Sequence, residues 1–316
     1  MKKKNFLNKT FCPLPGYISP EWLPQHNKSI SNDFVEWFIG FTEGDGSFIV
    51  AKYKNKNGSI VTYARHFFIL NQKDPKALYK IRKNLGFGTI KKYYDKKQAT
   101  CYYRYIVSDI DGIQRLIQIF YGNLVLNKTQ QRFVLWLNAF NQRPSARSAI
   151  CKKKNQVNNL TTVSTNSLLS LNSAWLSGFI DAQGCFSIHY NKMRNYLYLR
   201  FIIDQKDEYL ILEKIKILLN SGYIEKRNKI ENMFRYVISY TKVLDLSLLK
   251  DLPNGPQNNL FFLLFKYLKK FPLKTNKNID FIRFKKIWIR LHDGIIRESG
   301  TKKYKRLLRL IKTLSL

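Results

Sequence analysis

The chain has 316 residues, of which 45% are hydrophobic and 15% aromatic, so it can bury a substantial core and is not intrinsically disordered. Lysine and arginine number 55 against 21 aspartates and glutamates, which gives a formal net charge of +34 and favours a polyanionic partner. Of the possible polyanionic partners, nucleic acid is favoured, because the cations run along the whole chain. An acidic membrane surface normally engages one basic helix or tail.

A solvated basic surface without a partner is the third possibility. No apolar run reaches the roughly 18–20 residues that span a bilayer, and the basic N-terminus lacks the apolar segment of a secretory signal. The cysteines show no CxxC pair and no zinc-binding spacing, so we expect free thiols in a reducing compartment. Heavy use of Phe, Tyr, Lys, Asn and Ile, whose codons are rich in A and T, indicates an organellar gene and predicts a mitochondrial location, with a plastid as the alternative.

The predicted elements begin after a proline-rich segment. Residues 1–30 contain Pro13, Pro15, Pro20 and Pro24 and are expected to form an irregular arm. Apolar spacing then predicts a first unit over residues 31–142, whose first helix should end at the glycines 44 and 46. Its elements are a helix at 33–44, strands at 47–54 and 61–71, a helix at 75–84, strands at 87–94 and 101–108, and helices at 110–120 and 129–140.

A second unit repeats that order. Residues 143–172 are rich in Asn, Ser, Thr and Lys and are expected to be an exposed linker. The unit at 173–316 is predicted to contain a helix at 173–182, strands at 185–191 and 196–203, a helix at 208–220, strands at 222–228 and 233–240, and further helices. Each unit is therefore expected to be an α+β arrangement, a four-stranded antiparallel sheet backed by helices, in the order helix-strand-strand-helix-strand-strand-helix.

Three blocks of sequence recur in the same order in the two units. The pairs are WFIGFTEGDGSF at 37–48 and WLSGFIDAQGCF at 175–186, FILNQKD at 68–74 and FIIDQKD at 201–207, and RYIVS at 104–108 and RYVIS at 235–239. Repeats of this length are fused domains and not a solenoid. The chain is thus predicted to be a monomer with internal pseudo-two-fold symmetry, able to meet a duplex as a dimer would.

The first helix of each unit carries residues suited to chemistry. Small residues lie four apart on one helix face, at Gly40 and Gly44 and at Gly178 and Ala182. Two such faces can approach almost backbone to backbone, which would bring Asp45 and Gln183 together at the seam between two basic sheets. A carboxylate at a helix C-terminus is electrostatically disfavoured, so we expect a divalent cation to compensate it. Magnesium held by carboxylate between phosphates is a recurrent device of phosphodiester hydrolysis.

Two segments resemble copies of the LAGLIDADG motif, namely FIGFTEGDG at 38–46 and LSGFIDAQG at 176–184. Together with their spacing, the element order and the net charge, they make the chain similar to the double-motif LAGLIDADG homing endonucleases encoded in organellar introns. The resemblance covers about residues 33–140 and 173–315. It implies a monomer whose two saddle-shaped sheets bind a long duplex site in consecutive major grooves, and whose seam cuts both strands with Mg²⁺ or Mn²⁺.

The resemblance also implies roles for individual residues. Asp45, at the eighth motif position, would bind the metal and activate water, and the glutamines that end the second strand of each unit would orient that water. A lysine ahead of the last long helix of each unit would stabilise developing charge. The implied catalytic set is Asp45, Gln183, Gln72, Gln205, Lys128 and Lys274, and the implied metal set is Asp45, Gln183, Gly44 and Ala182.

Gln183 departs from the family pattern, which has Asp or Glu at this position. An amide oxygen can touch a metal, but it brings no charge and cannot act as a base. Three outcomes are open: asymmetric cleavage of both strands, nicking of one strand, or binding without cleavage, and Gln183 could also be drift in a decaying gene. The acids at the sixth motif position, Glu43 and Asp181, are expected to hydrogen-bond structure instead of binding metal.

Strand alternation predicts which side chains face the nucleic acid. If Phe48 and Val50 face the helices, the side chains between them face the groove, where Gln, Arg or Lys can contact base edges. The remaining lysines are expected to neutralise phosphates. The predicted DNA-binding set is Ser47, Tyr53, Arg65, Lys91, Arg104, Ser187, His189, Arg200, Arg227 and Arg235.

Three functions remain open. The first is a site-specific DNA endonuclease or nickase that spreads its own intron. The second is an RNA-binding splicing cofactor, or maturase, which Gln183 favours because that role needs no metal-binding acid. The third is a general basic nucleic-acid binder, against which the retained Asp45 argues.

Overall fold

The computed structural model describes residues 30–51, 65–96, 98–142, 168–191, 193, 196–243, 260–292 and 302–312. The expected arm at 1–30 lies outside the described residues apart from residue 30, and so does the expected linker at 143–172 apart from its last five residues. Tyr53 also lies outside them.

The first unit forms a four-stranded antiparallel sheet in the order β1-β2-β4-β3. The predicted elements are present, and α1 continues one residue past Gly44 before Gly46 caps it. The elements are α1 Asn32–Asp45, β1 Gly46–Ala51, β2 Arg65–Gln72, α2 Lys76–Leu85, β3 Thr89–Asp95, β4 Thr100–Val107, α3 Ile110–Phe120 and α4 Asn127–Asn141.

The second unit repeats this order through its fourth strand and then has three described helices, with a sheet arranged β5-β6-β8-β7. Its elements are α6 Trp175–Gln183, β5 Gly184–Asn191, β6 Tyr196–Lys206, α7 Tyr209–Leu219, β7 Tyr223–Lys226, β8 Met233–Val243, α8 Phe262–Lys270, α9 Lys277–His292 and α10 Lys302–Lys312. The α+β class and the two four-stranded antiparallel sheets are thus as the sequence predicts. Within the described ranges, every helix is either too short or too polar to span a bilayer.

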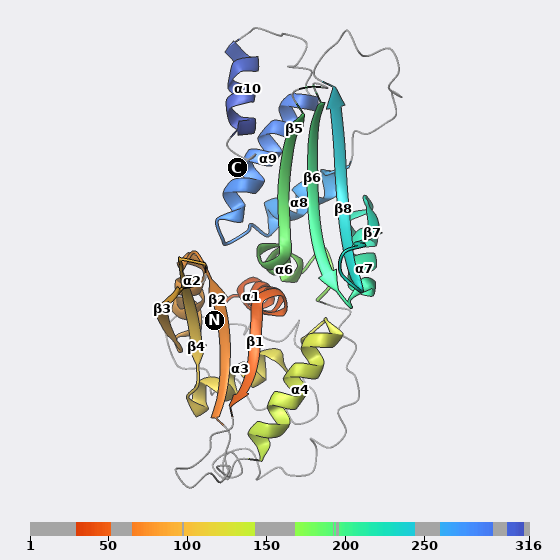
Figure 1. The fold of residues 1–316 in the computed structure, drawn as a ribbon. Helices are drawn as coiled ribbons and strands as arrows, with labels where there is room; N and C mark the ends of the chain where they lie inside the picture. Colours follow the sequence, from red (N-terminus) through yellow and green to blue (C-terminus); the bar gives the residue numbers. More distant parts are fainter. Residues whose placement is uncertain are drawn as a thin grey trace, which may run out of the picture.

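Among the described residues, the helices cover one face of each sheet (Figure 1). Along β2, Phe68 and Leu70 are fully buried, whereas Arg65 and Asn71 on the other face are exposed. This alternation follows from the two-residue period of a strand, and it places the aromatic core between the sheet and its helices. No helix of the described ranges covers the opposite face of either sheet, which carries polar and basic side chains among some apolar ones.

The two units meet through α1 and α6, which lie side by side between the sheets (Figure 1). A Cβ on Gly40 would overlap the backbone oxygen of Trp175, and a Cβ on Gly178 would overlap that of Trp37. The two backbones are therefore in contact at both glycines, as the spacing of small residues predicts.

Replacing Gly178 with alanine should destabilise the protein, because the new methyl group meets rigid backbone and cannot be accommodated by a side-chain rotation. We expect a loss of about 1–3 kcal/mol in the free energy of unfolding, measured by urea denaturation. Lys214→Ala, on an exposed position of α7, is the control and should change stability little. Equal midpoints for the two variants would contradict the backbone contact.

Candidate active site

Asp45 and Gln183 lie together where α1 and α6 end. The side-chain Nε2 of Gln183 donates to Oδ1 of Asp45 at 3.2 Å and to the backbone oxygen of Gly44 at 2.9 Å. Each residue is the last of its helix, so the contact between the helices brings the two side chains into reach of one another. The proximity that the motif spacing predicts is therefore present.

A second glutamine holds the other oxygen of the same carboxylate. Gln72, the last residue of β2, donates from Nε2 to Oδ2 of Asp45 at 2.6 Å. Burial raises the pKa of Asp45, while the hydrogen bonds from Gln72 and Gln183 and the charge of Lys277 act to lower it. The carboxylate is thus fixed in orientation by two amide donors.

Lys277, the first residue of α9, lies near the Asp45 carboxylate and is not among the lysines that the sequence singles out. Its Nζ donates to the backbone oxygen of Ala182 at 2.8 Å and to that of Ile180 at 3.4 Å. Burial lowers the pKa of this lysine, and the nearby charge of Asp45 opposes that effect. The ammonium group therefore lies at the end of α6, against the seam.

The two acids at the sixth motif position accept hydrogen bonds from backbone amides and tryptophan side chains, as expected. Glu43 accepts hydrogen bonds from the backbone of Val125 and Leu126, at 2.8 and 2.7 Å, and from Nε1 of Trp175 at 2.6 Å. Burial raises the pKa of Glu43 to about 8. Each of these contacts ties the helix pair to the loop before α4 or to the opposite unit.

Asp181 has the same arrangement in the second unit. It accepts from Nε1 of Trp37 at 2.8 Å and from the backbone of Lys274 and Thr275, at 2.6 and 3.2 Å. Each tryptophan therefore donates to the acid of the opposite motif, across the pseudo-two-fold axis. Both acids are used in joining the halves.

These contacts reveal which lysines are equivalent. Val125 and Leu126 occupy the place of Lys274 and Thr275, so counting on by three makes Lys128 the counterpart of Lys277. The Nζ of Lys274 lies 5.5 Å from the ring centroid of Trp37. In the sequence Lys128 and Lys274 match because each precedes a threonine, whereas these hydrogen bonds pair Lys128 with Lys277.

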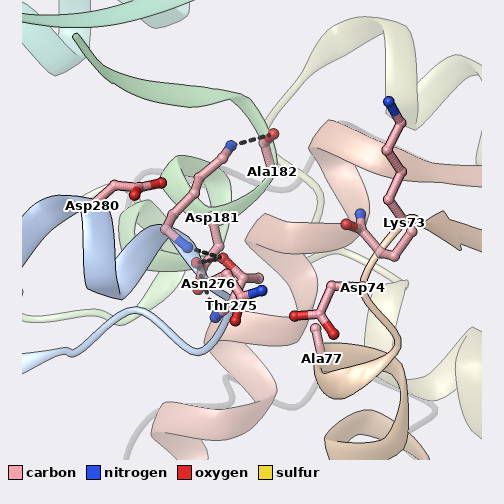
Figure 2. A pocket seen from close by; sticks show the side chains of 10 residues that line it. Lys73, Asp74, Ala77, Asp181, Ala182, Thr275, Asn276 and Asp280 are labelled. Atoms are coloured by element: carbon pink, nitrogen blue, oxygen red, sulfur yellow. Dashed lines mark hydrogen bonds between the residues drawn. The ribbon is translucent and has the colours of Figure 1, made fainter. Parts of the chain in front are cut away.

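Two hollows flank the helix pair, one on each side. Figure 2 shows the first, in which Thr275 lies on one side of the hollow and Asp74 on the other. The second contains Gln183 together with Gln205, Lys128 and Glu208. The hollows correspond by pseudo-symmetry: Gln72 and Lys277 line the first, and Gln205 and Lys128 line the second.

Glu208 distinguishes the second hollow, because the equivalent position in the first unit is Pro75. Its Oε1 accepts from the backbone of Lys128 at 2.8 Å. Burial raises the pKa of Glu208, and the hydrogen bond and charge of Lys128 act to lower it. Lys128 thus has Glu208 as its carboxylate neighbour, whereas Lys277 in the first hollow has Asp45.

The oxygen atoms at the seam are of the kind that ligate a hard divalent cation. Asp45 offers carboxylate oxygens and Gly44 and Ala182 offer backbone oxygens, while rotation of the Gln183 amide would present its oxygen in place of its nitrogen. Within the described residues, no group of three or more His, Cys, Asp or Glu could hold a metal. A cation here would therefore rest on one carboxylate and neutral oxygens, which matches the way Mg²⁺ keeps several waters.

The predicted DNA-binding residues within the described ranges lie on or beside the open sheet faces. Arg65, Lys91 and His189 are exposed, and the others are half-buried. In the first sheet these residues are Ser47, Arg65, Lys91 and Arg104; in the second they are Ser187, His189, Arg200 and Arg235, with Arg227 directly after β7. The strand register therefore agrees with the faces assigned by alternation.

Both halves of the chain are similar to known proteins. The family model described as "LAGLIDADG endonuclease" matches residues 38–140 and 176–250. "Probable intron-encoded endonuclease 4" of Neurospora crassa is 31% identical over 269 residues, which is 83% of this chain and 40% of that protein. "Probable intron-encoded endonuclease Cox1-I1b" of Schizosaccharomyces pombe is 28% identical, over 62% of this chain and 52% of that protein. The chain thus spans about half or less of these two relatives.

A shorter relative is matched over nearly its whole length. "Probable intron-encoded endonuclease aI3" of Dictyostelium citrinum is 27% identical, over 83% of this chain and 98% of that protein. Among solved structures, the I-LtrWI LAGLIDADG homing endonuclease bound to target DNA has a TM-score of 0.64 at 19% identity, covering 90% of this chain and 98% of that one. The I-GzeII enzyme in complex with its DNA target has a TM-score of 0.63 at 18% identity, over 90% and 98%. These structures share the fold.

Asp181→Asn should reduce stability, because one oxygen that now accepts hydrogen bonds becomes an NH2 group. That group would face the N–H donors of Trp37, Lys274 and Thr275 without being able to accept from them. We expect a loss of about 1–3 kcal/mol in the free energy of unfolding, followed by urea denaturation. Asp111→Asn, at an exposed position in the first turn of α3, makes the same change of charge and should have a small effect. If both substitutions were equally mild, the structural role of Asp181 would be refuted.

Proposed function

The chain belongs to the LAGLIDADG endonuclease family, and on that premise we propose that it is a site-specific, divalent-metal-dependent double-stranded DNA endonuclease acting in intron homing. The observation that carries the proposal is the Asp45 carboxylate, held by Gln72 and Gln183 at the seam between two sheets with open polar faces. A protein that only bound nucleic acid would have no use for an oriented carboxylate there. We infer that it acts as a monomer, because its two units supply both halves of the site.

The chemistry follows from the groups around that carboxylate. Asp45, the Gln183 amide and the backbone oxygens of Gly44 and Ala182 would hold Mg²⁺ or Mn²⁺, which lowers the pKa of bound water and stabilises charge on the phosphate oxygens. Gln72 orients water and the carboxylate.

We assign charge stabilisation to the lysines beside the hollows. Lys277 places an ammonium group next to the seam on the Asp45 side, where it can balance negative charge that develops on the phosphate. Lys128 is its counterpart on the other side, with Gln205 in the place of Gln72. Lys274 remains a candidate from sequence.

The two halves of this site are unequal. On one side Asp45 lies with Gln72 and Lys277. On the other, Gln183 stands at the motif position where the family pattern has an acid, and the carboxylate of that hollow, Glu208, binds the backbone of Lys128 instead. A neutral amide binds a cation less strongly and cannot accept a proton from water. We therefore propose that cleavage is biased to one strand.

We further propose that the chain consists of an arm at 1–30, a first unit at 31–142, a linker at 143–172 and a second unit at 173–316. A mitochondrial location is supported by the cox1 genes named for two relatives, with a plastid as the alternative. The second candidate function is a maturase bound to its own intron RNA, which Gln183 favours because splicing assistance needs no second acid.

The first experiment uses a supercoiled plasmid that carries the joined exons without the intron, incubated with the protein and Mg²⁺ and resolved on a gel. We expect a nicked circle that precedes linear product, and no product with Asp45→Asn, because the charged metal ligand is gone. Gln183→Glu should accelerate the second cut.

The outcomes separate the functions. Product that stops at the nicked circle, and becomes linear with Gln183→Glu, identifies a one-strand enzyme. A plasmid that stays intact although the protein binds it specifically would refute the endonuclease proposal, and faster splicing of the intron RNA would then identify the maturase.

Lys277→Met should slow cleavage at least about tenfold while duplex binding changes little, since the lost ammonium group faces the seam and not the open sheet. Lys286→Met removes the same charge from an exposed position on the same helix and should keep the rate. Lys274→Met tests the alternative lysine. The assignment would be wrong if Lys274→Met, and not Lys277→Met, abolished cleavage in gel assays with Mg²⁺.

A further inference from the structure

One cross-strand row of side chains differs in charge between the two sheets. In the first sheet, Arg104 on β4 lies opposite Asn71 on β2 and Lys91 on β3. The equivalent row of the second sheet has Arg235 on β8, opposite Asp204 on β6 and Glu225 on β7. Directly opposite residues share a face, so each row lies on the open side of its sheet.

The first row holds its arginine in place and contains no carboxylate that pairs with it. Arg104 donates from Nε to Oδ1 of Asn71 at 2.9 Å, which orients the guanidinium without neutralising it. The guanidinium carbon lies 4.8 Å from the ring centroid of Tyr93 and 5.6 Å from that of Tyr102. The two rings are stacked on one another. Such packing pre-orders a long side chain and lowers the entropy lost on binding.

In the second row the arginine forms an ion pair with a carboxylate of the same row. Arg235 donates from Nε and Nη2 to the two carboxylate oxygens of Asp204, each at 2.6 Å. Its side chain is 17% exposed, and Glu225 adds a second negative charge beside it. Counting formal charges, the row formed by Asp204, Arg235 and Glu225 is −1, whereas the row formed by Asn71, Arg104 and Lys91 is +2.

The rows also lie close to the candidate active site. Asn71 and Asp204 each precede the glutamine, Gln72 or Gln205, that lines a hollow beside the helix pair. A duplex lying across both open faces would meet the two rows at corresponding places on either side of the seam. It would meet an attractive charge in one row and a repulsive one in the other.

We propose that the two sheets hold the duplex unequally, with Arg104 as a specificity-determining contact near the seam and Arg235 as an internal partner of Asp204. This inference rests on the proposed DNA-binding function. The chemistry that Arg104 would recognise is a pair of acceptor oxygen or nitrogen atoms, and a guanine edge in the major groove presents such a pair to a guanidinium. Phosphate oxygens offer the same chemistry without sequence information.

Near-isosteric exchanges between the two rows provide the test. Asn71→Asp gives Arg104 the carboxylate that Arg235 has, and Asp204→Asn gives Arg235 the neutral amide that Arg104 has. Binding is measured in EDTA with a duplex carrying the joined exons and with a random duplex of equal length, over a range of salt concentrations. Arg104→Ala and Arg235→Ala are measured beside them, with thermal unfolding of each variant to confirm folding.

We expect Arg104→Ala and Asn71→Asp to weaken binding of the exon duplex about tenfold. Arg235→Ala should weaken binding by a smaller factor, about threefold, because it removes no contact with the duplex but leaves the Asp204 carboxylate unpaired and takes the row from −1 to −2. Asp204→Asn should tighten binding and steepen the salt dependence by about one phosphate contact. A loss with Arg104→Ala on the exon duplex alone indicates base recognition, and an equal loss on both duplexes indicates phosphate contact and overturns the assignment of specificity.

The inference is overturned if Arg235→Ala weakens binding as much as Arg104→Ala, or if Asp204→Asn leaves affinity unchanged, while the unmodified protein still binds and cuts the plasmid. An unmodified protein that binds neither duplex overturns the proposed function, and the inference with it. The two failures are therefore distinguishable.

Discussion

The contact between α1 and α6 is the constraint on which the rest of the structure depends. Gly40 and Gly178 each face a backbone oxygen of the other helix, so no side chain can enter between them. Since β1 and β5 begin at the residue after each helix, this contact also sets how the two sheets are placed. It brings Asp45 and Gln183 within hydrogen-bond distance, which neither unit could do alone.

The same seam explains why, of three acids in the two motifs, only Asp45 is left for the metal-binding role that we propose. Glu43 and Asp181 are buried and accept hydrogen bonds from backbone amides and from the tryptophan of the opposite helix. A buried acid without such donors would be costly, and these donors are what join the halves. With Gln183 in the eighth position of the second motif, Asp45 is the carboxylate left at the ends of the helix pair.

The two units have kept the same framework while their polar residues have diverged. The strand order and register are equivalent, yet Glu208 stands where the first unit has Pro75, and Asp204 stands where it has Asn71. Each of these two differences adds a negative charge to the second unit. At the seam the reverse holds, because Gln183 is neutral where the first unit has Asp45. The electrostatic field over a bound duplex would therefore be asymmetric even though the backbone is nearly two-fold symmetric.

The order of elements, the repeat, the helix pairing and the open sheet faces all follow from patterns along the chain, because strand period, helix period and small-residue spacing are local properties. Lys277 does not: Lys128 and Lys274 match in sequence, and only the amides bound by Glu43 and Asp181 reveal the true equivalence. The pairing of Arg235 is likewise invisible to alternation, which gives a face but no partner. Such partners are chosen by contacts between residues far apart in the chain, which folding decides through packing and register.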